Sequence, residues 1–226
     1  MNFPLPVKAV TIDLDGTLLD TIPDLAAAAN MMLAELGRAP LDPELIRTFV
    51  GKGLANLVER TLTASMDASA DPELLERAMP IYTRHYTQVN GRHTTIYPGV
   101  KEGLDRLRAL QFPLACVTNK SGQFTEPLLD FIGLAPYFSH VVSGDTLPTK
   151  KPHPAPLLHA CEALAIAPGD MLMIGDSMND TQAARAAGCP VFCVTYGYNE
   201  GHDVRDLDTD ALIDSLVDAA ALIERA

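Results

Sequence analysis

Two acidic side chains directly after an apolar run are the feature of this chain that points most clearly to chemistry. Residues 7–12 are apolar and largely β-branched, so they predict a buried strand of the parallel type that ends at Asp13-Leu14-Asp15-Gly16-Thr17. In an extended chain the side chains of Asp13 and Asp15 point to one face of the sheet. Two carboxylates at that spacing repel each other unless a cation or a shared proton offsets them. The alternative is an ordinary acidic turn after a strand.

Three further polar segments lie at comparable places. Residues 113–117 form an apolar run that ends in Thr118-Asn119-Lys120-Ser121, and residues 171–174 lead into Gly175-Asp176-Ser177-Met178-Asn179-Asp180. Lys150-Lys151-Pro152-His153-Pro154 precedes a helical run. Open parallel α/β sheets bind ligands at the carboxyl ends of their strands, so we expect these segments to converge. Singly, each also has an ordinary role as a helix cap, a solvated charge or a turn.

On these motifs the chain resembles the phosphatase branch of the haloacid dehalogenase superfamily. The four segments correspond in order to its four signature motifs, and the resemblance covers nearly the whole length. The combination of DLDGT with a later GDxxxD is highly specific, whereas the threonine and lysine motifs are weak alone. Residues 144–157 and 21–25 resemble bacterial phosphoglycolate phosphatases in particular. The resemblance implies hydrolysis of 2-phosphoglycolate to glycolate and phosphate through an aspartyl-phosphate.

The resemblance also implies a role for each acidic residue. Asp13 is expected to be the nucleophile and a ligand of Mg²⁺. Asp15 is expected to act as general acid and then general base, with its main-chain carbonyl as a second metal ligand. Asp176 corresponds to the third protein ligand. Asp180 is expected to position Asp176 or a metal-bound water, and direct ligation is the less favoured alternative.

Phosphate binding and substrate choice involve other residues. Thr118, Asn119 and Lys151 correspond to the groups that hold the phosphoryl group, and Lys151 is chosen over Lys150 because Pro152 follows it directly. Lys52 lies in a glycine-flanked loop where related enzymes carry a specificity loop. We therefore expect Lys52, or less favourably Arg47, to bind a substrate carboxylate. A flexible loop with an exposed lysine is an equally good interpretation.

Other activities fit the same motifs. The first alternative is a phosphatase for another small phosphate, such as a sugar phosphate or pyrophosphate, and the second is a phosphotransferase like β-phosphoglucomutase. Dehalogenation is disfavoured because a halide needs no proton, so that reaction needs neither Asp15 nor a metal. A non-catalytic protein that retains a phosphate pocket is disfavoured because all four motifs are intact.

Composition limits the binding partners and the cellular compartment that we expect. The 226 residues carry a formal net charge of -12, which disfavours binding to nucleic acid or to an anionic membrane. No apolar run approaches the roughly 20 residues that cross a bilayer, and no secretory signal is evident. The four cysteines lack a CxxC pair, which favours a reducing cytoplasm. We expect a monomer or homodimer whose partner is a small phosphorylated substrate.

The pattern of elements predicts an α/β fold with a Rossmann-like parallel sheet and an inserted helical cap. From residue 100 onward strands alternate with helices, the last helix spanning residues 211–224. Residues 18–94 contain no convincing strand and show helix starts at Pro23, Asp42-Pro43 and Asp71-Pro72. Pro80 is expected to kink or divide the last of these helices. The core is therefore assigned to 1–17 and 95–226, and the cap to 18–94.

Overall fold

A parallel sheet forms the centre of the molecule. The computed structural model describes residues 3–226, so Met1 and Asn2 of the expected N-terminal core segment lie outside the described residues. Within this range the strand order is β6-β5-β2-β7-β8-β9. These strands are β2 (Ala9–Ile12), β5 (Leu114–Val117), β6 (His140–Val142), β7 (Met171–Gly175), β8 (Val191–Val194) and β9 (Ala211–Ile213). The α/β fold expected from the sequence is confirmed.

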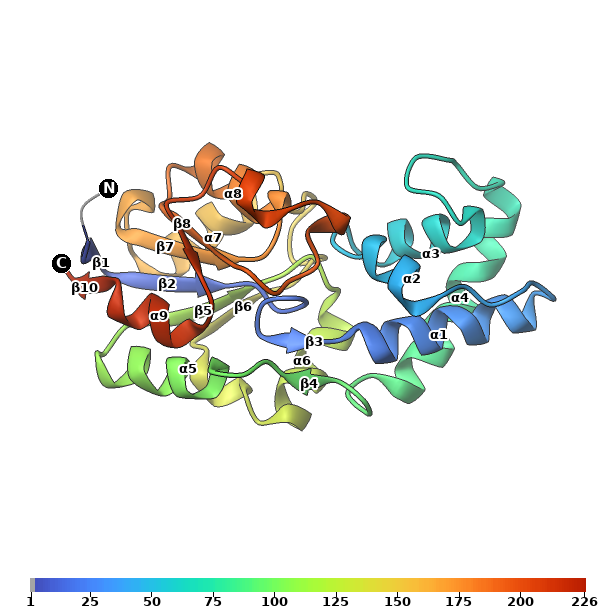
Figure 1. Cartoon of the computed structure of the whole chain (residues 1–226), viewed down its shortest axis with the longest axis horizontal. Coiled ribbons are helices and arrows are strands. Elements are labelled where there is room, and N and C mark those ends of the chain that lie inside the picture. The colour runs from blue at the N-terminus through green and yellow to red at the C-terminus, as the bar shows by residue number, and fades with distance from the viewer. Residues whose placement is uncertain (1–2) are drawn as a thin grey trace.

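The central strand β2 marks the point where the direction of sheet growth reverses. The chain adds β5 and β6 on one side of β2, and then β7, β8 and β9 on the other (Figure 1). Strand β2 pairs with β5 through Ile12 and Cys116, and with β7 through Ile12 and Ile174. The carboxyl ends of these three strands therefore meet at the reversal, which is where open α/β sheets bind ligands.

Helices cover both faces of the sheet because successive residues of each strand point to opposite sides. Val10 and Ile12 pack with helices α5 (Val100–Ala109), α6 (Gly122–Ile132) and α9 (Leu216–Ala221). Ala9 packs on the other face with helices α7 (Ala155–Leu164) and α8 (Met178–Ala187). Figure 1 shows α7 and α8 above the sheet and α5 and α9 below it. The four-residue β2 is buried along its whole length.

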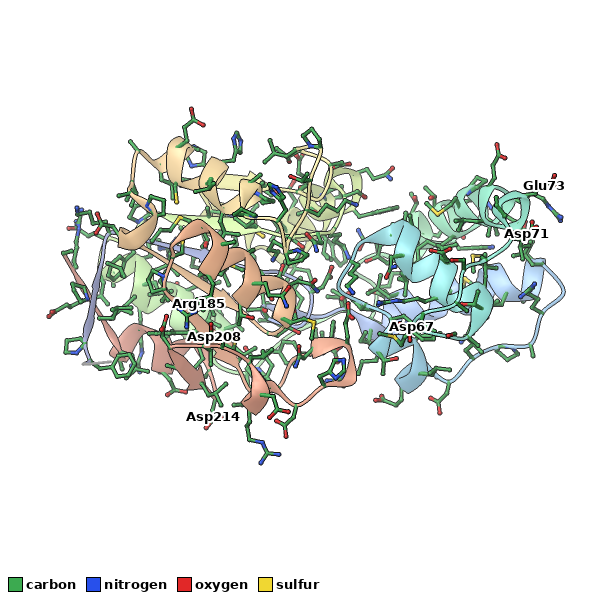
Figure 2. The ribbon with its side chains drawn as sticks, turned by 90° about the horizontal axis from the view of Figure 1, so that it is seen from above. Asp67, Asp71, Glu73, Arg185, Asp208 and Asp214 are labelled. Atoms are coloured by element: carbon green, nitrogen blue, oxygen red, sulfur yellow. The ribbon has the colours of Figure 1, made fainter. Side chains whose placement is uncertain are left out.

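A group of helices with its own hydrophobic cluster lies beyond one end of the sheet (Figure 1). It consists of α1 (Ile22–Glu35), α2 (Pro43–Thr48), α3 (Leu54–Thr63) and α4 (Pro72–Val89). Asp42 and Asp71 accept hydrogen bonds from the main-chain N–H of Glu44 and Leu74, so both predicted helix starts are confirmed. Asp71 lies at the end of this group that is remote from the sheet (Figure 2).

The two chain connections to this group are fastened to each other. Strand β3 (Leu19–Asp20) pairs antiparallel with β4 (Thr95–Ile96), although the sequence predicts no strand near residue 19. The fully buried carboxylate of Asp24 on α1 accepts hydrogen bonds from the main-chain N–H groups of Gly91, His93 and Thr94. The segment that leads from the sheet into the helical group and the segment that leads back therefore lie side by side, and these hydrogen bonds join them.

The expected helix over residues 211–224 is wrong. That segment contains strand β9, helix α9 and strand β10 (Ile223–Arg225), and β10 pairs with β1 (Leu5–Val7). The hydroxyl of Ser215 accepts a hydrogen bond from the main-chain N–H of Asp218, which fixes the helix start after Ser215. Ile213 is then free to pair with Val194 at the sheet edge.

Of the kink or division expected at Pro80, a division is wrong, because α4 is one helix from Pro72 to Val89 with Pro80 inside it. The remaining short elements are the 3₁₀ turns η1 (Ala135–Tyr137), η2 (Pro168–Asp170), η3 (Asn199–Gly201) and η4 (Val204–Asp206). On α8, Arg185 pairs with Asp208 (Figure 2) and with Asp210, which ties this helix to the segment before β9. No helix among residues 3–226 is both long and apolar enough to span a membrane.

Candidate active site

A cavity of about 670 Å³, its open mouth included, lies between the strand ends and the cap helices. It brings together seven of the residues singled out in the sequence: Asp13, Asp15, Thr118, Asn119, Lys151, Asp176 and Asp180. The opposite wall comes from residues 18–94 and is mostly apolar, with Leu25, Val50, Gly51, Gly53, Leu54, Leu57 and Tyr86.

Three buried carboxylates gather at the ends of β2 and β7. One oxygen from each of Asp13, Asp176 and Asp180 lies within 4.8 Å of the others. Burial raises the pKa of Asp13 to about 6, against the opposing charge of Lys151. Burial, together with the charges of Asp180 and Asp13, raises the pKa of Asp176 to about 8. The cluster is therefore an unfavourable place for so much negative charge unless a cation joins it.

The donor set fits a divalent cation. Asp13, Asp176 and Asp180 face a single ammonium group, that of Lys151, so ionised carboxylates exceed the positive charge beside them. Hard cations such as Mg²⁺ prefer carboxylate and carbonyl oxygens, and these are the groups present.

Main-chain groups fix the orientation of Asp176. Its Oδ2 accepts a hydrogen bond from the Tyr198 N–H at 2.6 Å, and its Oδ1 accepts one from the Thr17 hydroxyl at 3.2 Å. Gly16 adopts a positive φ of 89°, and a Cβ there would lie 2.5 Å from Asp176 Oδ2. The glycine of DLDGT, Gly16, is therefore required for two reasons, because the left-handed backbone and the close approach of Asp176 both disfavour a side chain.

The carboxylate of Asp180 is fully engaged in hydrogen bonds. Its Oδ2 accepts from the main-chain N–H groups of Asp176 and Ser177 and from the Ser177 hydroxyl at 2.9 Å. Its Oδ1 accepts from the Lys151 ammonium at 2.6 Å. The three hydrogen bonds to Oδ2 tie Asp180 to the main chain of Asp176 and Ser177, so the geometry favours a positioning role.

Lys151 is held in a fixed place beside Asp13. Its ammonium donates to Asp13 Oδ1 at 2.8 Å, to the Val117 carbonyl at 2.6 Å and to Asp180 Oδ1. Burial alone lowers the pKa of Lys151, but the charges of Asp13 and Asp180 outweigh burial and raise the pKa above its usual value. The group is a permanent cation whose three N–H donors all have acceptors within the protein.

The threonine motif reaches the cavity in a different manner from Asn119. The Thr118 hydroxyl accepts a hydrogen bond from the Lys120 N–H, so its own proton can be donated into the cavity. The Asn119 amide instead donates to the carbonyls of Gly51 and Lys151, each at 2.8 Å, and accepts from the Lys151 N–H. A phosphate contact from Asn119 would therefore come from its main-chain N–H.

Asp15 lies beside two residues that the sequence reasoning missed, Lys120 and Tyr86. Asp15 Oδ1 accepts hydrogen bonds from the Thr21 hydroxyl at 2.8 Å and from the Lys120 ammonium at 3.0 Å. The buried Lys120 also donates to the Tyr86 hydroxyl at 2.5 Å. Lys120 directly follows Thr118-Asn119, so its place at a strand end was a signal. Tyr86 lies on α4 and carried none.

Comparison with known proteins places the chain in a family. The sequence model of the family of haloacid dehalogenase-like hydrolases matches residues 10–194 of this chain. The chain belongs to the haloacid dehalogenase-like hydrolase family. The matched range contains every strand end that contributes to the cavity.

Relatives in this hydrolase family match over the full length. A phosphoglycolate phosphatase of Nitrosospira multiformis is 61% identical over 226 residues, which is 100% of both chains. A phosphoglycolate phosphatase of Thiobacillus denitrificans is 55% identical over 225 residues, covering 100% of this chain and 99% of the relative. A crystal structure of a predicted phosphoglycolate phosphatase from Haemophilus somnus has a TM-score of 0.89 and 32% identity, covering 94% and 96% of the two chains.

The two cap residues expected to bind a substrate carboxylate lie elsewhere in this hydrolase. The Lys52 ammonium is 3.4 Å from Glu200 Oε2, and the Lys52 side chain is 42% exposed. Arg47 donates to the carbonyls of Tyr196 and Gly197. Neither Lys52 nor Arg47 is among the residues that line the cavity.

Proposed function

We propose that this chain is a Mg²⁺-dependent phosphatase that hydrolyses 2-phosphoglycolate to glycolate and phosphate. The observation that carries the proposal is the buried Asp13 carboxylate, held by Lys151 at the end of the central strand and facing Asp176. The name shared by the full-length relatives supports the choice of substrate.

In the first half-reaction, Asp13 attacks the phosphorus and the ester P–O bond breaks. Asp13 Oδ1 is engaged by Lys151, and no hydrogen bond within residues 3–226 engages Oδ2, which is the oxygen placed to attack. The departing glycolate oxygen takes a proton from Asp15. Lys151 and the Thr118 hydroxyl stabilise the charge that spreads over the phosphoryl oxygens.

In the second half-reaction, Asp15 accepts a proton from a water molecule that attacks the aspartyl-phosphate. The bond between Asp13 and phosphorus breaks, phosphate leaves, and the Asp13 carboxylate is restored. A carboxylate nucleophile thus divides one difficult displacement into two easier steps.

Asp13, Asp176 and the main-chain carbonyl of Asp15 would hold the Mg²⁺, with Asp180 orienting Asp176 through its main-chain N–H. The bound cation supplies charge compensation for the carboxylates and the phosphate. We further propose that residues 18–94 act as the cap and residues 1–17 and 95–226 as the catalytic core. The apolar cap wall would then exclude water from the reacting groups.

A phosphate-release assay with and without Mg²⁺ tests the proposal. The substrates would be 2-phosphoglycolate, a hexose phosphate, pyrophosphate and β-glucose 1-phosphate, the last also assayed for glucose 6-phosphate. We expect 2-phosphoglycolate to have the highest kcat/KM and EDTA to abolish turnover. A higher kcat/KM for another phosphate, or phosphoryl transfer without release, would assign the activity to one of the alternatives.

A further inference from the structure

We propose that Lys120 and Tyr86, which contact each other in the cavity, form the subsite that binds the carboxylate of the substrate. This inference rests on the proposed function, since it concerns the second anionic group of 2-phosphoglycolate. Lys120 follows the threonine motif at the end of β5, and Tyr86 lies on α4 of the cap. A carboxylate that accepts hydrogen bonds from both would join the two parts of the molecule.

The first argument comes from the available cations. Among the described residues that line the cavity, the cationic ones are Lys151 and Lys120. The three N–H donors of Lys151 already have acceptors within the protein. The Lys120 ammonium donates to the Tyr86 hydroxyl and to Asp15 Oδ1 at 3.0 Å, and its contact with Asp15 Oδ2 is longer, at 3.3 Å, so a ligand can take over that third N–H donor.

The second argument comes from the Tyr86 hydroxyl. This oxygen accepts the hydrogen bond from Lys120, and within residues 3–226 its own proton has no acceptor. Burial raises the pKa of Tyr86 well above its usual value, so the hydroxyl keeps that proton. Beside Lys120, the Ser121 hydroxyl oxygen is buried and also lacks a hydrogen-bond partner, although Ser121 lines the cavity. Together these groups offer an anion two hydroxyl donors that nothing else in the described chain uses, beside the Lys120 ammonium.

The third argument comes from the size of the substrate. In 2-phosphoglycolate one methylene separates the ester oxygen from the carboxylate carbon, so the carboxylate must lie close to the acid that protonates that oxygen. The Lys120 ammonium is 3.0 Å from Asp15 Oδ1, which places a cation at that position. It also offsets the repulsion between the Asp15 carboxylate and a bound carboxylate.

The test compares two substrates of nearly equal size, 2-phosphoglycolate and 2-hydroxyethyl phosphate, which has a neutral hydroxymethyl group in place of the carboxylate. Lys120→Met is expected to slow both, because Lys120 also contacts Asp15. The ratio of the two kcat/KM values should fall about 10- to 150-fold, the range for a hydrogen bond to a charged group. Tyr86→Phe should shift the ratio in the same direction, also by about 10- to 150-fold, because its hydroxyl would donate to the charged carboxylate.

Two other lysines serve as matched controls. Lys8 forms an ion pair with Asp170, and neither residue lines the cavity. Lys8→Met should therefore leave the ratio of the two kcat/KM values unchanged. Lys52→Met tests the competing assignment to the cap loop. If Lys120→Met does not fold, Lys120→Gln and Tyr86→Phe provide the same comparison with smaller changes in volume.

Equal losses on both substrates in the Lys120 and Tyr86 variants would overturn the inference and leave Lys120 as a positioning residue for Asp15. A ratio that falls only in Lys52→Met would overturn it in favour of the cap loop. The proposed function fails separately, if the unmodified protein shows no preference for 2-phosphoglycolate over 2-hydroxyethyl phosphate.

Discussion

The two walls of the cavity are built in opposite ways. On the core side, the oxygens of Asp176 and Asp180 are held by main-chain N–H groups and by hydroxyls at fixed distances. On the cap side, the wall is mostly leucine, valine and glycine, and Tyr86 contributes a hydroxyl. Under the proposed function, the core wall would set the chemistry, whereas the cap wall would exclude water and select what fits. Substitutions on the two walls should therefore differ in size and in kind.

The largest effect is expected for Asp13→Asn on the core wall. Loss of the nucleophile should lower kcat at least about 10⁴-fold, while the isosteric amide leaves the fold intact. Phosphate release and circular dichroism would measure the two properties. Asp67→Asn, at an exposed position of the cap (Figure 2), is the matched control and should keep full activity. Substantial turnover in Asp13→Asn would require a different nucleophile.

Asp15→Asn is expected to lower kcat about 10²- to 10⁴-fold on 2-phosphoglycolate, the usual range for a positioned acid–base group. The loss should be smaller when the first half-reaction is followed with p-nitrophenyl phosphate, because nitrophenolate departs without a proton. Burst amplitudes with both substrates would separate the two halves. The same loss in the burst phase for both leaving groups would exclude Asp15 as the general acid.

Asp176→Asn should weaken the loss of stability with rising pH that is expected in EDTA. The Asp176 carboxyl has a pKa near 8 when folded against 3.8 as its reference value, so the folded state binds more protons between these values. Metal-free protein should therefore lose stability as pH rises from about 4 to 8. At pH 8 the variant should be more stable by at least about 1 kcal/mol, or about 2–4 °C in Tm.

Thermal unfolding at pH 5 and pH 8 would measure this, with Mg²⁺ added in a second series. Mg²⁺ should raise Tm more at pH 8 than at pH 5, because binding there displaces fewer protons. If the pH dependence of Tm is unchanged in Asp176→Asn, the loss of stability at high pH comes from another carboxyl group.

The smallest effect is expected on the cap wall. Leu54→Ala removes part of an apolar surface that lines the cavity, and KM should rise about 2- to 10-fold with kcat nearly unchanged. Leu45→Ala, at an exposed position of α2 that does not line the cavity, is the control. A large fall in kcat for Leu54→Ala would contradict the division of roles between the walls.

The sequence predicted much of the core wall because three of the four motifs directly follow a strand. Asp13, Thr118 and Asp176 are each the first residue after β2, β5 or β7, so strand assignment alone brought them to one edge. Parallel pairing of these three strands then set their proximity. Their proposed roles still depend on the family resemblance and on the kinetic tests.

The cap wall could not be predicted in the same way. Lys120 and Tyr86 are 34 residues apart, and their contact depends on how α4 packs over the core. Lys52 was favoured because glycines flank it, but its ammonium lies near Glu200. Near the C-terminus, apolar residues at helical spacing led to the prediction of one helix where the structure has strand β9 before helix α9. The start of α9 is set by the hydrogen bond to the Ser215 hydroxyl, which the apolar spacing does not reveal.

The paired connections between cap and core have a mechanical consequence. A body tethered by one flexible strand can turn about three axes, whereas two adjacent tethers that are tied together leave one easy rotation. The β3–β4 ladder and the Asp24 carboxylate make such a double tether. Any opening of the cavity would then be described by a single angle, and it would have to break the contact between Tyr86 and Lys120.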